Sequence, residues 1–165
     1  MNRILILSAL ILSFLSIQAQ STNPQAELQA LTLKVDSLDH ELAYLKVTYE
    51  LNLLSSDMTM LKNEIYSRAI AIKLDIRARD FNSKIDDMNQ KLYDSFKNQI
   101  DSFHKLADAK KEYFFAMTTK YSFSESELRI LTMGCERINL QFDQLEKTMD
   151  LFKTVVDYYS FKMRH

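Results

Sequence analysis

The fold is decided by residues 128–163, which read LRILTMGCERINLQFDQLEKTMDLFKTVVDYYSFKM. Apolar side chains recur along this stretch in alternating steps of three and four residues. They are Leu128, Leu131, Cys135, Ile138, Phe142, Leu145, Met149, Phe152, Val156, Tyr159 and Met163. Because the spacing averages about 3.5 residues, it places all of these side chains on one side of a long α-helix. The stretch therefore predicts a helix that packs lengthwise against other helices.

A second ladder with the same spacing lies near the other end of the chain. It consists of Leu28, Leu31, Val35, Leu38, Leu42, Leu45 and Tyr49. The whole sequence has one proline, Pro24, and one glycine, Gly134, and therefore very few of the residues that favour turns. Sheets and irregular domains need such residues in their turns, whereas long helices do not. The composition therefore predicts an all-α fold.

Helix boundaries follow from capping signals. Asn23 followed by Pro24 is a favourable helix start, and Ser124 with Glu127 fits a capping box. A weaker break lies near residues 79–83.

We expect an elongated antiparallel three-helix bundle with coiled-coil-like packing and helices at about 24–78, 83–120 and 124–163. The alternative is a four-helix bundle with a turn at residues 55–57, where the sequence is Ser-Ser-Asp.

Folding the chain at the two expected turns places apolar residues of neighbouring helices opposite one another. Phe103 then faces Phe142, and Met88 faces Val156. Lys110 interrupts this series, and we expect its long side chain to pass the apolar core and reach solvent.

The first nineteen residues have the pattern of a secretory signal peptide. Arg3 precedes an apolar run, and Ala19 is a small residue before a polar segment. The run is shorter than the roughly 20 residues that span a bilayer as a helix, so we expect cleavage rather than the alternative of a retained anchor. Cleavage after Ala19 leaves one helical-bundle domain at 20–165, exported to the periplasm or the outside of the cell, with no stable membrane anchor.

Charge and chemistry exclude several classes of function. Removing Arg3 from the 21 basic and 22 acidic residues leaves 20 and 22, a near balance that argues against nucleic-acid binding. His40, His104 and His165 are far apart, and no Glu-x-x-His or paired Cys–His spacing is present. We therefore predict no catalytic, cofactor or metal site and no enzyme activity.

Cys135 lies on the ladder of residues 128–163. We expect a buried free thiol, and the alternative is an intermolecular disulfide.

The N-terminal ladder predicts a contact with a partner. If the first helix is unbroken, residues 24–41 extend past the bundle and leave an apolar stripe without an intramolecular partner. We call this stripe the N-terminal seam; it consists of Leu28, Leu31, Val35 and Leu38. With Leu28 at heptad position a, Lys34 faces Asp39 of a parallel second copy, and Glu41 faces Lys46. Both pairs are opposite in charge, which favours homo-oligomers.

One charged residue lies close to an apolar position of the first helix. Arg68 falls between Ile65 and Ile72, and the second expected turn brings it near Tyr93 and Asp94. We interpret this group as a structural polar pair that fixes helix register, with ligand binding by Arg68 as the alternative.

Taken together, these patterns predict an exported non-enzymatic helical scaffold or protein-interaction module that associates with itself through the N-terminal heptads. The alternative is a periplasmic holdase chaperone or carrier of apolar cargo, because the chain has eight Met, ten Phe and eight Tyr. Methionine in particular gives an adaptable apolar surface.

Overall fold

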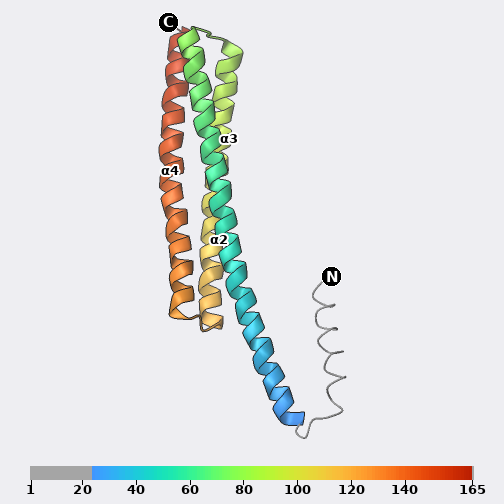
Figure 1. The fold of residues 1–165 in the computed structure, drawn as a ribbon. Coiled ribbons are helices and arrows are strands. Elements are labelled where there is room, and N and C mark those ends of the chain that lie inside the picture. The colour runs from blue at the N-terminus through green and yellow to red at the C-terminus, as the bar shows by residue number, and fades with distance from the viewer. Residues whose placement is uncertain (1–23, 165) are drawn as a thin grey trace. The chain divides into compact units, whose positions relative to one another are not determined.

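The computed structural model describes residues 24–164, and these form three helices joined by two short connections. The helices are α2 (Pro24–Ala78), α3 (Ser83–Lys120) and α4 (Glu125–Arg164), and no strand occurs between residues 24 and 164 (Figure 1). The chain divides into two compact units, the first ending at Glu41 and the second beginning at Leu42. The predicted signal peptide lies outside the described residues.

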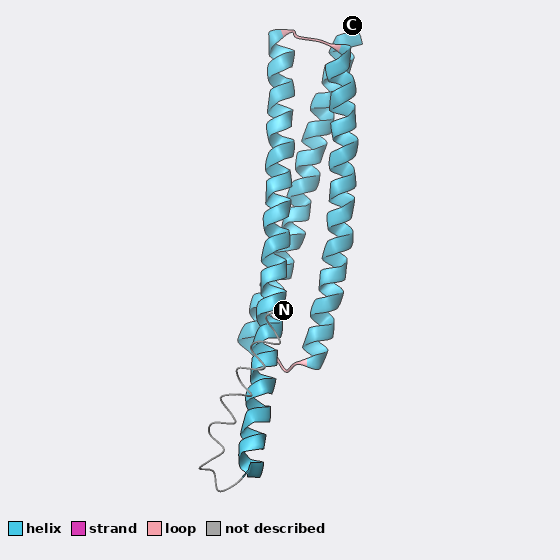
Figure 2. Ribbon diagram, turned by 90° about the vertical axis from the view of Figure 1, so that its right-hand side faces the viewer, coloured by secondary structure: helices cyan, strands magenta, loops and turns pink. Residues whose placement is uncertain are grey.

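The second unit is a three-helix bundle made of α2 from Leu42 onward, α3 and α4. The two connections lie at opposite ends of this bundle, so that each helix runs antiparallel to the next (Figure 2). The all-α, three-helix prediction is confirmed, and the predicted helix bounds agree with the observed ones within one residue. The prediction of a single domain over residues 20–165 stays a prediction.

Helix α2 continues through residues 55–57, so the four-helix alternative is wrong. Ser55 is buried within the helix, and its carbonyl accepts a hydrogen bond of 2.9 Å from the Thr59 hydroxyl. Leu54 and Met58 on either side are buried in the bundle. A turn here would remove both side chains from the core, and the cost of that exposure outweighs the low helix propensity of the serines.

The ladder of α4 forms one side of the core, as its spacing predicts. Its fully or nearly fully buried members are Leu131, Ile138, Phe142, Leu145, Met149, Phe152, Val156 and Tyr159. The opposing core residues of α2 are Ala43, Val47, Leu51, Leu54, Met58, Leu61, Ile65, Ala69 and Ile72, and those of α3 include Phe96, Ile100, Ala107 and Phe114. Phe96 and Phe152 meet edge to face, with their ring centroids 5.5 Å apart.

Helix α2 ends in a Schellman motif. The amide of Asp80 donates to the carbonyl of Asp75 at 3.0 Å, and the amide of Arg79 donates to the carbonyl of Ile76 at 3.2 Å. Arg79 has a φ of 58°, which is the left-handed conformation that this motif requires. The two hydrogen bonds satisfy carbonyls that the end of the helix would leave without a partner.

Tyr159 of α4 ties this connection to the bundle. Its hydroxyl donates to the carbonyl of Asp80 at 3.0 Å and accepts from the amide of Asn82 at 2.9 Å. The ring of Phe81 packs against it, with centroids 5.4 Å apart. The Asn82 side chain in turn caps α3 by accepting from the amide of Lys84 at 2.8 Å. One buried tyrosine therefore fixes the backbone between α2 and α3.

The connection between α3 and α4 contains the predicted capping box. The amide of Ser124 donates to the Glu127 carboxylate at 2.8 Å, and the amide of Glu127 donates to the Ser124 hydroxyl at 3.3 Å. Phe123, just before the cap, is buried and packs against Tyr44 of α2, with ring centroids 6.3 Å apart.

Met88, which was predicted to face Val156, is about half exposed, and polar residues take the inward positions beside it. Asp86 and Asn89 are buried there, and the hydroxyl of Ser160 donates to the Asp86 carboxylate. The apolar spacing passes over such positions, since a polar residue in a core gives no periodic signal.

Lys110 also differs from its predicted position. Its ammonium group forms an ion pair with Glu50 of α2, with an N–O distance of 2.6 Å, and both side chains are largely shielded from solvent. The expected extension into solvent is wrong because an acidic residue on the neighbouring helix lies within reach.

Candidate functional site

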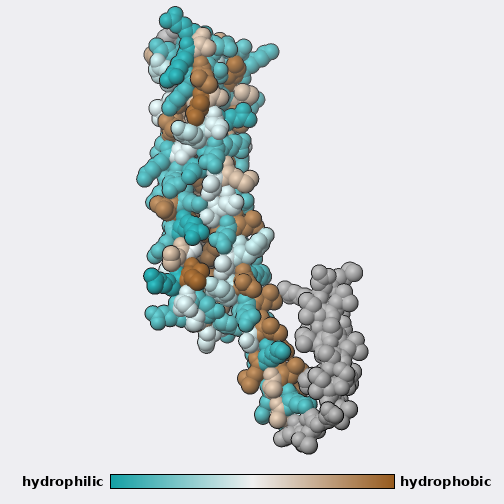
Figure 3. Space-filling model, viewed as in Figure 1, coloured by the Kyte–Doolittle hydropathy of each residue, from teal (hydrophilic) through white to brown (hydrophobic). Residues whose placement is uncertain are grey.

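The N-terminal seam lies on the part of α2 that belongs to the first unit. Leu28, Val35 and Leu38 expose 62%, 51% and 47% of their surface, respectively. Leu31 is partly exposed. Apolar side chains gather on this part of α2 in the space-filling view (Figure 3). Between residues 24 and 41 the helix therefore presents apolar side chains to solvent at regular helical spacing.

Where α2 enters the bundle, the helix carries apolar side chains on two of its sides, one buried and one exposed. Val47 and Leu51 are buried, with exposed fractions of 2% and 4%. The next members of the N-terminal ladder are not buried, since Leu45 and Tyr49 are 61% and 67% exposed and Leu42 is also exposed. We call these three exposed residues the outer strip. The sequence prediction of the seam stopped at Leu38 and missed them, although the same spacing continues through Tyr49.

Charged residues flank these apolar positions on both sides. Lys34 and Glu41 lie on one flank, and Asp39 and Lys46 lie on the other. The Lys46 ammonium group also lies 5.0 Å from the ring centroid of Tyr113 on α3. Charges at such flanking positions influence the choice of partner and the orientation of paired helices.

The predicted polar group around Arg68 is not brought together. Arg68 and Asp94 are both exposed, and within residues 24–164 Arg68 forms no ion pair with Asp94 and no cation–π contact with Tyr93. The physical reason is the position of Ala69, which is buried and takes the inward place between Ile65 and Ile72. Arg68 therefore lies beside the core face of α2 and needs no buried partner.

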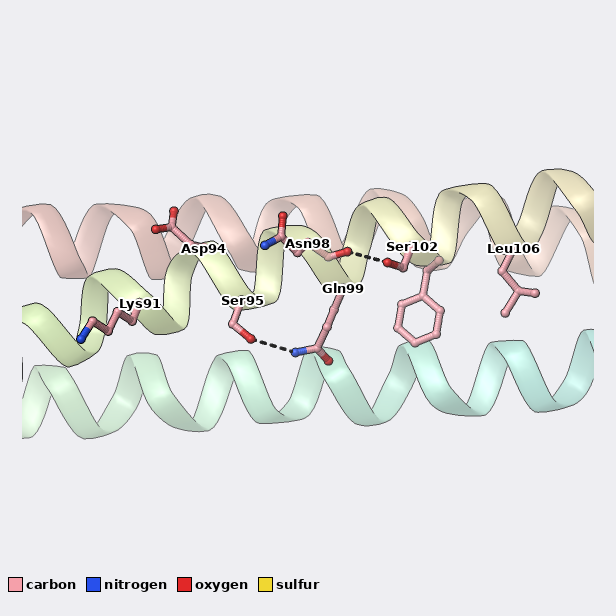
Figure 4. Close-up of a pocket in the computed structure, with 8 residues that line it drawn as sticks. Lys91, Asp94, Ser95, Asn98, Gln99, Ser102 and Leu106 are labelled. Carbon is pink, nitrogen blue, oxygen red and sulfur yellow. Dashed lines mark hydrogen bonds between the residues drawn. The ribbon is translucent and has the colours of Figure 1, made fainter.

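One hollow on the described surface runs along α3. It has a volume of about 620 Å³ and is lined by Lys91, Asp94, Ser95, Asn98, Gln99, Ser102, Phe103 and Leu106. Figure 4 shows that these side chains all come from one helix, where the Gln99 amide donates to the Ser95 hydroxyl at 3.4 Å and the Ser102 hydroxyl donates to the Asn98 carbonyl at 2.8 Å. The hollow is open to solvent and has no enclosing wall, and its lining combines polar side chains with the apolar Phe103 and Leu106.

Cys135 is partly buried on α4 and is a free thiol. Burial raises the pKa of this thiol above its ordinary value; Lys111 lowers the pKa and Glu136 raises it by smaller amounts. Because the thiolate is the reactive form, this environment makes the thiol less nucleophilic.

His104 of α3 lies between an aromatic ring and a carboxylate of α4. His104 stacks on Phe142 at a centroid distance of 3.9 Å, and its Nε2 lies 3.6 Å from the exposed carboxylate of Glu146. Among residues 24–164, no three His, Cys, Asp or Glu side chains are grouped as metal ligands would be. The predictions about enzyme activity and cofactors stay predictions.

Within residues 24–164, no helix combines the length and the apolar character needed to cross a membrane. No protein-family model, curated protein or solved structure matches this chain.

Proposed function

We propose that this protein is an exported, non-enzymatic helical scaffold whose copies associate through the N-terminal seam of α2. The observation that carries the proposal is the exposure of Leu28, Val35 and Leu38 at heptad spacing on a helix. Exposed apolar side chains scattered singly are common on protein surfaces, but a regular stripe of them usually marks an interaction site.

The flanking charges favour a second copy as the partner. In a parallel pair of helices with Leu28 at position a, each g residue lies beside the e residue of the next heptad on the other helix. Lys34 then meets Asp39 of the second copy, and Glu41 meets Lys46. These opposite charges add little energy at an exposed position, but they disfavour antiparallel or shifted arrangements that bring like charges together.

Light scattering coupled to size exclusion tests the association on the mature chain, residues 20–165. The wild type is expected to form an oligomer, and Leu38→Asp is expected to be a monomer because a carboxylate in the seam cannot be buried without a partner. Leu33→Asp is the matched control: Leu33 is 70% exposed but lies about 140° around the helix from Leu38. A monomeric wild type, or equal loss in both variants, would contradict the proposal.

Export is tested separately by expression of the whole chain with a C-terminal tag in a Gram-negative host. We expect tagged protein in the periplasm or medium with a mass that corresponds to cleavage after Ala19. Replacing Leu7 and Leu12 by Arg should block translocation, since both lie in the apolar run that a signal sequence needs. Recovery of the uncleaved chain in the cytoplasm would refute this part of the proposal.

Exposed methionines favour a second candidate, a holdase or carrier of apolar cargo. Met60, Met88 and Met133 expose about half or more of their surface on the bundle unit. Flexible, polarisable side chains of this kind bind varied apolar surfaces. A monomer that suppresses aggregation of a chemically unfolded protein at stoichiometric ratio, and that loses this effect when the three methionines become Gln, would favour this candidate over the scaffold.

A further inference from the structure

The start of the bundle unit contains a helix that is apolar on two opposite sides. At about 100° per residue, Leu42, Leu45 and Tyr49 lie between about 120° and 180° around α2 from the buried Leu51. These three residues therefore lie on the side of α2 that faces away from α3 and α4, and neither helix covers them. All three are exposed, as described above, although core residues Ala43 and Val47 alternate with them in the sequence.

These three residues occupy the same heptad positions, a and d, as the residues of the N-terminal seam. With Leu28 at position a, Leu42 and Tyr49 also occupy a positions, and Leu45 occupies a d position like Leu31 and Leu38. The seam alone covers two heptads, whereas a stable coiled coil is usually recognised over three to four. Adding the outer strip gives three complete heptads without an interruption in the spacing.

We propose that a second copy of this chain packs along the outer strip, with its own α2 parallel and in register, so that the bundle unit is itself part of the interface. This inference rests on the proposed self-association and extends it from residues 24–41 to Tyr49. Leu42, Leu45 and Tyr49 of one copy then meet the same residues of the other copy, which is the symmetry of a parallel two-stranded coil.

Charge complementarity supports this occupant on the bundle side. Glu41 belongs to the first unit and Lys46 to the second, so the pair between copies forms only if the parallel contact continues past residue 41. Lys46 already lies near the ring of Tyr113, at a position where the lysine is exposed. A cation–π contact at such a site is weak enough for the flexible lysine to turn toward a carboxylate on the second copy.

Disulfide trapping tests the inference. In the mature chain carrying Cys135→Ser, Leu38→Cys probes the seam, Leu45→Cys probes the outer strip, and Leu33→Cys is the control away from both. Equivalent d positions face each other across a parallel coil at a separation that a disulfide can bridge. Mild oxidation should convert Leu38→Cys and Leu45→Cys to covalent dimers at least about tenfold faster than Leu33→Cys.

The outcomes separate the inference from the proposed function. Rapid cross-linking of Leu38→Cys without that of Leu45→Cys would overturn the inference and leave the scaffold proposal standing. Slow cross-linking of all three variants, together with a monomeric wild type, would overturn both.

A charge substitution gives an independent measurement. Leu45→Asp should weaken association by roughly tenfold or more, because a leucine that becomes fully buried in the interface contributes at least that factor. Its circular dichroism and urea midpoint in the dilute monomer should match the wild type, since Leu45 does not enter the bundle core. Wild-type affinity in Leu45→Asp would overturn the inference.

Discussion

Helix α2 contains two regions with the same apolar spacing and different surroundings. From Leu51 to Ile72 the regularly spaced side chains are buried against α3 and α4, whereas from Leu28 to Tyr49 the members of the N-terminal ladder are largely exposed. The comparison teaches that a repeat of three and four residues identifies the apolar face of a helix but does not identify what covers that face. For the exposed region, we propose that a second copy covers it.

The largest expected effect compares two leucines of α2 within the bundle unit. Leu54→Ala should lower the free energy of unfolding by about 2–5 kcal/mol, because Leu54 is buried and its truncation leaves a cavity. Leu45→Ala, measured at a concentration where the chain is a monomer, should change it by about 0.5 kcal/mol or less. Urea denaturation followed by circular dichroism measures both. Equal losses would remove the distinction between the two faces.

A smaller effect is expected where the buried region of α2 ends. Tyr159→Phe should cost about 1–3 kcal/mol, because it removes the hydroxyl that bonds the amide of Asn82 and the carbonyl of Asp80. Amide hydrogen exchange should also become faster at residues 80–82 than elsewhere in the bundle. A control is Tyr158→Phe, whose ring is about half exposed and should tolerate the change. Unchanged exchange at residues 80–82 would show that the helix caps alone hold this connection.

The polar contacts of the two regions should differ as well. A double-mutant cycle on Glu50→Gln and Lys110→Met should give a coupling of about 1 kcal/mol in the monomer, since this pair is short and shielded from solvent. The same cycle on Lys34 and Asp39 should give no coupling in the monomer and should show one only in the affinity between copies. Coupling of Lys34 with Asp39 in the dilute monomer would contradict the parallel arrangement.

The smallest effect concerns Cys135, which lies on α4. Because burial raises the pKa of its thiol, the native protein should react slowly with iodoacetamide at neutral pH, and the rate should rise only above the ordinary pKa of a thiol. Thr132→Cys in a Cys135→Ser background is the exposed control on the same helix. Because the pKa of the thiol is raised in the folded state, Cys135 makes its whole contribution to the free energy of unfolding at a pH below the pKa of the thiol in the unfolded chain. This contribution is lost as the pH rises through the pKa of the thiol in the folded protein. Equal alkylation rates would show that Cys135 is not protected.

Sequence reasoning predicted those parts of the fold that depend on regular spacing and local capping. The ladder of α4 and the capping box of Ser124 and Glu127 are both observed, because each is a short-range pattern with one favourable conformation. It failed where a polar residue occupies a core position, as Asp86 and Asn89 do. A polar residue does not stand out in an apolar ladder, so the spacing predicted an inward position for Met88, next to the buried Asn89.

The candidate site was only partly predictable for a related reason. The N-terminal seam was identified from spacing and charge, but the predicted site ended at Leu38, although the ladder continues through Leu42, Leu45 and Tyr49. Only the helix orientation set by Val47 and Leu51 reveals that these three residues face away from the core. Which of two apolar faces packs inside a bundle is decided by the neighbouring helices, and this information is not local in sequence.

The most direct test of the division of α2 into two faces is the urea midpoint as a function of protein concentration. A partner that binds only the folded state stabilises it by mass action, so association makes the midpoint depend on concentration. We predict a midpoint that rises with concentration for the wild type and for Leu33→Asp, and a constant midpoint for Leu38→Asp. A midpoint independent of concentration in all three proteins would show that the exposed ladder does not join copies of the chain, and would contradict the account.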